Sequence, residues 1–135
     1  MSCSTGQALF TENNGNNQVY MRSYWSTTVS VTVNGQSRIY NDITLSGCIE
    51  VKDANGAIVD IPLTEQVDDS TTGIYKVPAV LPATDITSWK FSFDVATTTD
   101  VTPGLYNFTI FGTPLDGKKY VELIGVVEFA ETEDC

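Results

Sequence analysis

The chain has 135 residues, enough for one domain with its own core, and it is strongly acidic, with 17 Asp and Glu against 7 Lys and Arg and a net charge of −10. This charge argues against nucleic acids and anionic membranes as partners, because binding to phosphates needs clustered cations. The absence of His excludes a Ser–His or Cys–His nucleophile pair and metal sites built on His. No apolar run approaches the ~20 residues that span a bilayer, and no export signal is expected at the N-terminus.

Residues 1–24 differ from the rest of the chain, because Gly, Asn, Gln, Ser and Thr dominate them. Such a segment is too polar to form a core, so we expect an extended N-terminal arm over 1–24 and a β-sandwich over 25–135. Two interpretations of the arm stay open: a frayed terminus, or a segment that becomes ordered on a neighbouring subunit. In the second interpretation the anchors are Leu9, Phe10, Tyr20 and Tyr24.

Strand patterns begin at Trp25 and recur at short intervals with turns between them. Valines alternate with polar residues over 29–33, and Asn34 and Gly35 then predict a tight turn, because both central residues of such a turn need positive φ. Apolar residues again occupy alternate positions over 43–51, and a turn at 53–56 leads into a strand at 57–61. The prolines from Pro62 onward predict connections and edge pieces over 62–85, with one short strand at 73–77.

The C-terminal part predicts three antiparallel strands, over 89–95, 103–110 and 116–129. Period-two alternation gives each strand an apolar face, and in the first strand we expect this face to be core rather than a sugar-binding platform. Its members are Trp89, Phe91, Phe93 and Val95. The pattern as a whole predicts an all-β fold, a single antiparallel sandwich of about seven or eight strands that needs no helix.

The last strand predicts an interaction surface. Period two places one set of apolar side chains inward, namely Val121, Leu123, Val127 and Phe129, and the other set, Tyr120, Ile124 and Val126, on the opposite face with Glu122 and Glu128. We expect this second apolar set to be covered by the arm or by a partner. The candidate protein interface is therefore Leu9, Phe10, Tyr20, Tyr24, Tyr120, Ile124 and Val126.

No motif predicts catalysis, a cofactor or a metal. A carboxylate pair of the glycosidase type would need a cleft that a small sandwich rarely has. Asp68 and Asp69 form the best local acidic cluster and Asp53 precedes an Asn-Gly turn, yet no calcium-loop spacing follows, so solvated charge is the favoured interpretation. We expect Cys48 to be a buried or half-buried strand residue. A Cys3–Cys135 disulfide is possible if the termini meet.

The order of strands and turns over 42–129 carries a family resemblance. Its pieces are a strand at 42–47, a hairpin at 51–59, the aromatic strand at 89–93, Pro-Gly-Leu-Tyr at 103–106 entering a strand, and an Asp-Gly-Lys turn at 116–118 before 124–129. In this order the chain resembles the immunoglobulin-like N-terminal module of phage baseplate upper proteins and related virion domains. In immunoglobulin-like folds a Tyr placed like Tyr106 commonly ties a corner together.

The resemblance implies a non-enzymatic structural subunit of a tailed-phage virion, either a capsid decoration protein or a tail or baseplate component. Its partners would be other virion proteins or copies of itself. An alternative interpretation is a carbohydrate-binding or adhesin module, which predicts exposed aromatic residues.

Overall fold

The computed structural model describes residues 8–10 and 18–131, which form eleven strands and one short helix. The first five strands are β1 (Ala8–Phe10), β2 (Gln18–Tyr20), β3 (Trp25–Val29), β4 (Thr32–Val33) and β5 (Gln36–Ser37). They are followed by β6 (Thr44–Lys52), β7 (Ile58–Thr64), β8 (Gly73–Lys76), β9 (Trp89–Phe93), α1 (Val95–Thr99), β10 (Gly104–Thr113) and β11 (Tyr120–Ala130).

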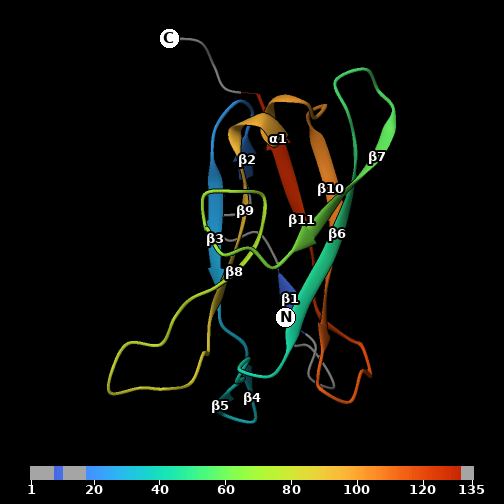
Figure 1. Ribbon diagram of the computed structural model, residues 1–135. Helices are drawn as coiled ribbons and strands as arrows, with labels where there is room; N and C mark the ends of the chain where they lie inside the picture. The colour runs from blue at the N-terminus through green and yellow to red at the C-terminus, as the bar shows by residue number, and fades with distance from the viewer. Residues whose placement is uncertain (1–7, 11–17, 132–135) are drawn as a thin grey trace.

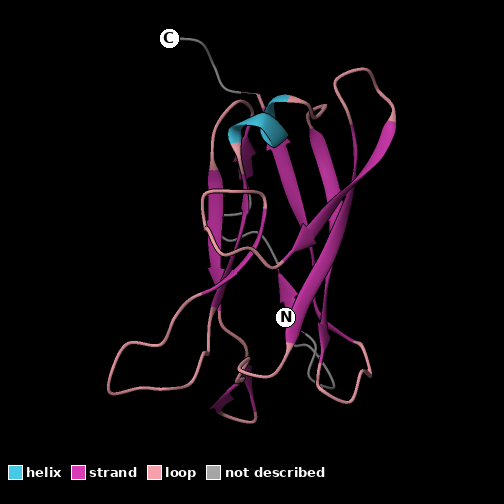
Figure 2. Ribbon diagram, in the orientation of Figure 1, coloured by secondary structure: helices cyan, strands magenta, loops and turns pink. Residues whose placement is uncertain are grey.

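Two sheets face each other (Figure 1). Sheet A has the order β1-β11-β10-β6-β7, with β2 also paired to β11, and sheet B has the order β3-β9-β8. The α1 turn lies at one end of the sandwich and the small β4-β5 hairpin at the other (Figure 2). The predicted all-β sandwich is therefore confirmed, and its β3-β9-β8 and β6-β10-β11 groups correspond to the two layers of an immunoglobulin-like fold.

The core lies between the sheets and is built largely from aromatic rings. Phe91 of sheet B contacts Phe108 of sheet A with ring centroids 4.9 Å apart, and Phe93 contacts Phe129 at 5.3 Å. The predicted inward residues of β9, Trp89, Phe91 and Phe93, are all fully buried, which confirms the core interpretation.

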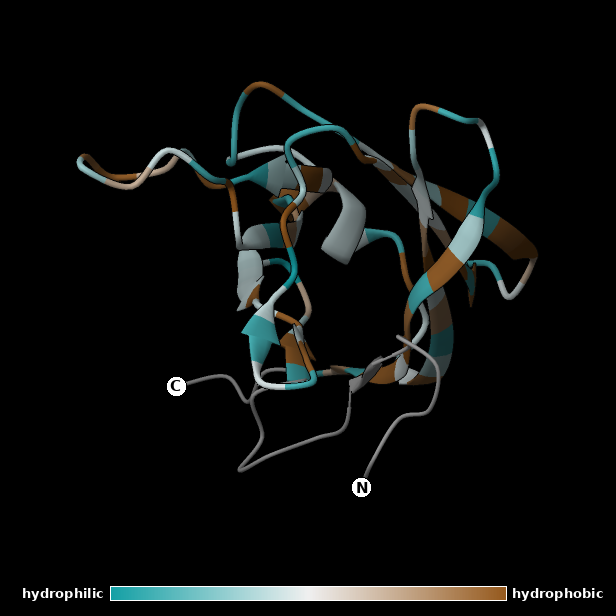
Figure 3. Cartoon of the chain, turned by 90° about the horizontal axis from the view of Figure 1, so that it is seen from below, coloured by the Kyte–Doolittle hydropathy of each residue, from teal (hydrophilic) through white to brown (hydrophobic). Residues whose placement is uncertain are grey.

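Turn chemistry follows the sequence closely. Asn34 and Gly35 have φ of 53° and 80°, and they join β4 to β5 as the Asn-Gly pair predicts. The loop from β8 to β9 projects from the two layers (Figure 3) and carries the exposed apolar residues Val80 and Leu81. The Tyr106 hydroxyl donates to the Thr102 carbonyl at 2.6 Å, so this Tyr ties the corner before β10 as the resemblance implied.

Three expectations for the sheets need correction. The first of the three C-terminal strands, β9, belongs to sheet B rather than beside β10, and a helical turn connects the two. That turn arises because the Asp94 side chain accepts the N–H of Thr97 and caps α1, which leaves Val95 half exposed instead of inward. Sheet A is also not purely antiparallel, since β1 and β2 run parallel to β11.

The predicted boundary between arm and sandwich, at residue 24, falls too late. Strand β2 pairs with β11, and Val19 and Met21 lie in the core. Residues 18–24 therefore belong to the sandwich. Val19 and Met21 are two residues apart, so both side chains point to the same side and pack in the core while β2 pairs with β11. Strand β1 likewise adds to the edge of β11 over Leu123, Ile124 and Gly125.

Candidate functional site

The face of sheet A that is turned away from sheet B is called the outer face here. Strand register decides which side chains lie on it, because residues directly opposite one another point to the same face. Ile124 is opposite Thr109 and Val126 is opposite Asn107, and both alternate with inward residues of the core. Their side chains are 40% and 39% exposed, so the predicted outward position of these two residues holds.

A β-bulge near the start of β11 changes the phase of the strand. Ile110 is opposite Leu123 but Phe111 is opposite Val121, which leaves Glu122 as the extra residue. Before the bulge the alternation is therefore reversed, so the expected inward position of Val121 is wrong and Glu122 is buried instead of facing outward. Tyr120 lies inward over Gly112, where a β-carbon would come within 2.6 Å of the Tyr120 ring.

Tyr20 joins the outer face through β2. Val19 points into the core, so its neighbours Gln18 and Tyr20 point outward, and the Gln18 side chain donates to Glu128 at 3.2 Å on this face. Tyr20 is exposed, and its hydroxyl donates to Gln18. The structure thus brings Tyr20 to the same face as Ile124 and Val126.

The remaining predicted interface residues lie elsewhere. Tyr24 is exposed beside sheet B, where its hydroxyl donates to the Asp69 carbonyl. The side chains of Leu9 and Phe10 lie outside the described residues, although their backbone forms part of β1. Tyr120 is turned inward over Gly112, so it does not contribute to the outer face.

Leu105 adds a further exposed apolar side chain to this part of the outer face and was not predicted. It is 70% exposed and opposite Glu128, one diagonal step from Val126. The sequence could have revealed it, because period two places Leu105 on the opposite face of the strand from the buried Phe108 and Ile110. We define the outer patch as Tyr20, Leu105, Ile124 and Val126.

The bulge creates a buried polar cluster at the opposite end of β11 from Tyr20. The Glu122 carboxylate is 0% exposed and accepts hydrogen bonds from the Tyr40 hydroxyl at 2.8 Å and from Arg38 Nε at 3.2 Å. Burial raises the pKa of Tyr120 to about 12, and the Glu122 carboxylate contributes to this rise. Burial, with a further contribution from Glu122, also raises the pKa of Tyr40. The hydrogen bonds from Arg38 and Tyr40 tie β11 to the segment before β6. Because Glu122 has no contact with solvent, its carboxylate is not available to react with a substrate.

The predicted acidic cluster is occupied by neighbouring protein groups. Asp68 accepts from the backbone N–H and the hydroxyl of Ser70, which lowers its pKa, and Asp69 pairs with Lys90 at 3.0 Å. Asp53 accepts the N–H groups of Asn55 and Ala57 within its turn. Among residues 8–10 and 18–131, no group of three His, Cys, Asp or Glu side chains could hold a metal ion.

Cys48 is a half-buried residue of β6, as predicted, and it lies on the outer face opposite Thr109 and Pro62. Burial raises the pKa of its thiol, and the nearby carboxylates of Asp60 and Glu50 raise it further. The thiol is therefore a weak nucleophile at neutral pH. Cys3 and Cys135, for which the sequence leaves a disulfide open, lie outside the described residues.

No known protein family and no curated protein matches the sequence. A family 123 glycoside hydrolase from Clostridium perfringens, studied for glycolipid glycan hydrolysis, has a similar structure, with a TM-score of 0.42 and 12% identity. The match covers 93% of this chain and 23% of the hydrolase, so the chain spans about a quarter of that protein. A likeness at this level carries no argument about function. The helix of the described part of the chain, α1, is too short to cross a membrane.

Proposed function

We propose that the chain is a non-enzymatic structural subunit of a tailed-phage particle, either a capsid decoration protein or a tail or baseplate component. It binds a neighbouring virion protein, or another copy of itself, through the outer patch. The observation that carries this proposal is the gathering of Leu105, Ile124 and Val126 on the neighbouring strands β10 and β11, exposed on the outer face of sheet A. Exposed apolar groups on neighbouring strands favour a protein contact.

Two further points support the proposal. The order of strands and turns over 42–129 resembles that of virion modules, and immunoglobulin-like sandwiches are rigid scaffolds that present a face or loops to partners. The net charge of −10 favours a protein partner over nucleic acid.

The proposal is tested first by location. Immunogold electron microscopy of particles from the source, with antibody raised against this chain, is expected to label either the head or the tail. Label over the head supports decoration, and label over the tail supports a tail or baseplate position. Particles that carry no label contradict the virion role.

The outer patch is tested by substitution. Leu105→Lys combined with Ile124→Lys is expected to abolish incorporation of the chain into particles, while the thermal midpoint stays close to that of the unchanged protein. Val67→Lys is the matched control, since Val67 is fully exposed in the connection from β7 to β8 and is expected to incorporate normally. Normal incorporation of the double variant would exclude the outer patch as the contact.

A carbohydrate-binding module remains the alternative function. The exposed aromatic side chains that it would need are, in the part of the chain that the structure describes, Tyr20 and Tyr24, because the rings of β9 are buried. A glycan-array screen separates the two functions. Specific glycan binding that Tyr20→Ala and Tyr24→Ala abolish, together with unlabelled particles, would favour the alternative.

A further inference from the structure

Strand β7 is the free edge of sheet A on the side away from β1 and β2. Within the described residues its ladder partner is β6, and an isolated bridge between Glu65 and Ile74 follows just after its end. An edge strand offers unpaired N–H and C=O groups to any other strand that can reach it. The backbone groups of β7 that point away from β6 are therefore the ones that a further strand could bind.

The β6-β7 turn sets the direction of these backbone groups. The Asp53 N–H donates to the Ala57 carbonyl at 2.8 Å, and the register continues from this pair without a shift. Because hydrogen-bonded and non-hydrogen-bonded pairs alternate in an antiparallel ladder, residues 59 and 61 bond to β6 while Ile58 and Asp60 direct their N–H and C=O outward. Pro62 has the same phase as Asp60, and there its missing N–H breaks no bond of the ladder.

The free stretch runs over 58–62, about 17 Å at ~3.4 Å per residue. Beyond it the edge is covered, since the Gln66 side chain donates to the Thr64 carbonyl and the Gln66 N–H donates to Ile74 of β8. The available length is that of an ordinary short strand. It lies on the side of β7 that faces α1 (Figure 1).

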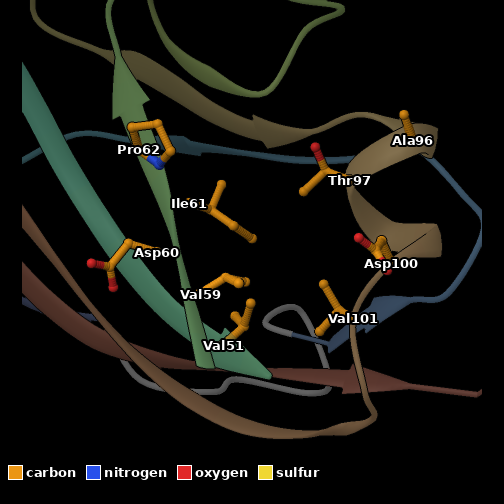
Figure 4. A pocket seen from close by; sticks show the side chains of 9 residues that line it. All are labelled: Val51, Val59, Asp60, Ile61, Pro62, Ala96, Thr97, Asp100 and Val101. Carbon is orange, nitrogen blue, oxygen red and sulfur yellow. The ribbon is translucent and has the colours of Figure 1, made fainter. Parts of the chain in front are cut away.

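A groove of about 320 Å³ opens between this free edge and α1. Figure 4 shows Val59 and Ile61 pointing into the groove and Asp60 pointing to the other side of β7. Val59 is 37% exposed although it faces inward, because the sandwich is open along this edge. Apolar side chains from β6, β7 and the α1 end line the groove, namely Val51, Val59, Ile61, Ala96 and Val101.

The surroundings of the free edge are acidic. Asp60 lies opposite Glu50 on the outer face, and Asp100 borders the groove at the end of α1. None of the three carboxylates takes part in an ion pair among the described residues, and the cation nearby is Lys52, opposite Ile58. A second copy would place the same carboxylates against themselves, whereas a cationic strand would pair with them.

We propose that the free edge over 58–62 and the adjoining groove bind an extended segment of another protein by strand addition. Every second side chain of the bound segment is apolar and enters the groove beside Val59 and Ile61, and the side chains between them are Lys or Arg and lie beside Asp60 and Glu50. Main-chain hydrogen bonds provide the affinity and the alternating pattern provides the specificity. The site is separate from the outer patch and does not depend on the proposed virion role.

Peptide titration of the full chain tests the site. The probe is an eight-residue capped peptide of alternating Val and Lys, added to ¹⁵N-labelled protein and followed by amide chemical shifts. We expect saturable shifts at residues 57–62 and 95–101 with a Kd below about 1 mM. Two control peptides, one with Glu in place of every Lys and one N-methylated at alternate backbone nitrogens, are expected to bind at least ~10-fold more weakly, because they lose the charge pairing and the ladder bonds respectively.

Two variants separate the charge from the backbone. Asp60→Lys is expected to weaken the Lys peptide about 3- to 10-fold and to strengthen the Glu peptide, while Asp116→Lys in the β10-β11 hairpin makes the same charge change at the other end of the sandwich and leaves both affinities unchanged. Ile58→Pro removes an outward N–H without breaking a bond to β6, and it is expected to weaken binding in a protein whose thermal midpoint is unchanged.

Several results would overturn the proposal. They are the absence of shifts at 57–62 with several millimolar peptide, equal binding of the N-methylated peptide, and an Asp60→Lys protein that keeps its preference for the Lys peptide. Shifts at 57–62 that grow with protein concentration alone would show that a second copy occupies the edge instead.

Discussion

Strands β9 and β11 face each other across the core, and they contribute to it in different ways. All three rings of β9, Trp89, Phe91 and Phe93, are fully buried at strict period two. Strand β11 keeps that period after residue 123, but the bulge at Glu122 turns a carboxylate into the interior. The regular strand is stabilised by buried apolar area, whereas the start of the bulged strand depends on how well one buried charge is paired.

The largest effect is expected from the regular strand. Phe91→Ala removes a ring that contacts Phe108 across the sheets and Phe93 and Trp25 within sheet B. The loss is expected to be about 3–5 kcal/mol of unfolding free energy, measured by urea titration. Phe111→Ala is the control and should cost less, because Phe111 is half-buried on the outer face rather than fully buried in the core. Equal losses in the two variants would contradict the assignment of the core.

The bulged strand is tested through the partner of Glu122. Arg38→Met leaves the Glu122 carboxylate buried with the Tyr40 hydroxyl as its remaining donor among the described residues, and it also removes the Arg38 guanidinium that lies 5.7 Å above the Tyr120 ring. We expect a loss of about 3 kcal/mol, because an unpaired buried charge cannot be solvated.

A double variant shows whether that loss comes from the charge. Arg38→Met combined with Glu122→Leu removes both partners, and its stability is expected to lie within about 1 kcal/mol of the unchanged protein. If the double variant is as unstable as the single one, shape rather than charge pairing at the bulge determines stability. The comparison between β9 and β11 would then lose its physical basis.

The fold was predictable where the sequence has a local pattern, either alternating apolar residues or a turn pair. The alternation over 43–51 and 89–93 gave β6 and β9, and Asn34-Gly35 gave the turn between β4 and β5. The bulge was not predictable, because an extra residue in β11 is defined only by its pairing with β10. Period two in a single strand cannot show it, so every side chain before Leu123 was assigned to the wrong face.

The candidate site was predictable to a similar degree. Ile124 and Val126 follow the bulge and keep the expected phase, whereas Tyr120 precedes it and does not. Leu105 could have been found from its phase within β10. The groove beside β7 could not have been found, because it depends on where α1 lies relative to the edge of the sheet. Helix α1 begins at the cap formed by Asp94, and in the sequence the residues around Asp94 continue the alternating pattern of a strand.

Alkaline pH is expected to lower the stability of the protein through the bulged end of β11, by an amount between the effects above and the one that follows. The pKa of Tyr120 is raised to about 12 and that of Tyr40 is also raised, so the folded state holds both phenol protons more tightly than the unfolded chain does. This stabilisation is complete below the ordinary Tyr pKa of about 10 and is lost as pH rises through the folded-state values. Urea midpoints should therefore fall above pH 10, and Tyr120→Phe should reduce the slope of that fall. An unchanged slope would mean that Tyr120 titrates alike in both states.

The smallest effect is expected at the regular end of β11, where Tyr106 packs on Phe129 with ring centroids 5.9 Å apart. Tyr106→Phe keeps this contact and removes the hydrogen bond to the Thr102 carbonyl, at an expected cost of about 0.5–1.5 kcal/mol. Tyr75→Phe is the control, since the structure shows no hydrogen bond to its hydroxyl within the described ranges, and it should change stability little. Thr102 directly follows Val101, which lines the groove beside β7, so the same variant is also expected to speed amide hydrogen exchange over 100–103. Faster exchange there without loss at β9 would show that the corner holds one wall of the groove, and unchanged exchange would show that α1 is held by its own cap at Asp94.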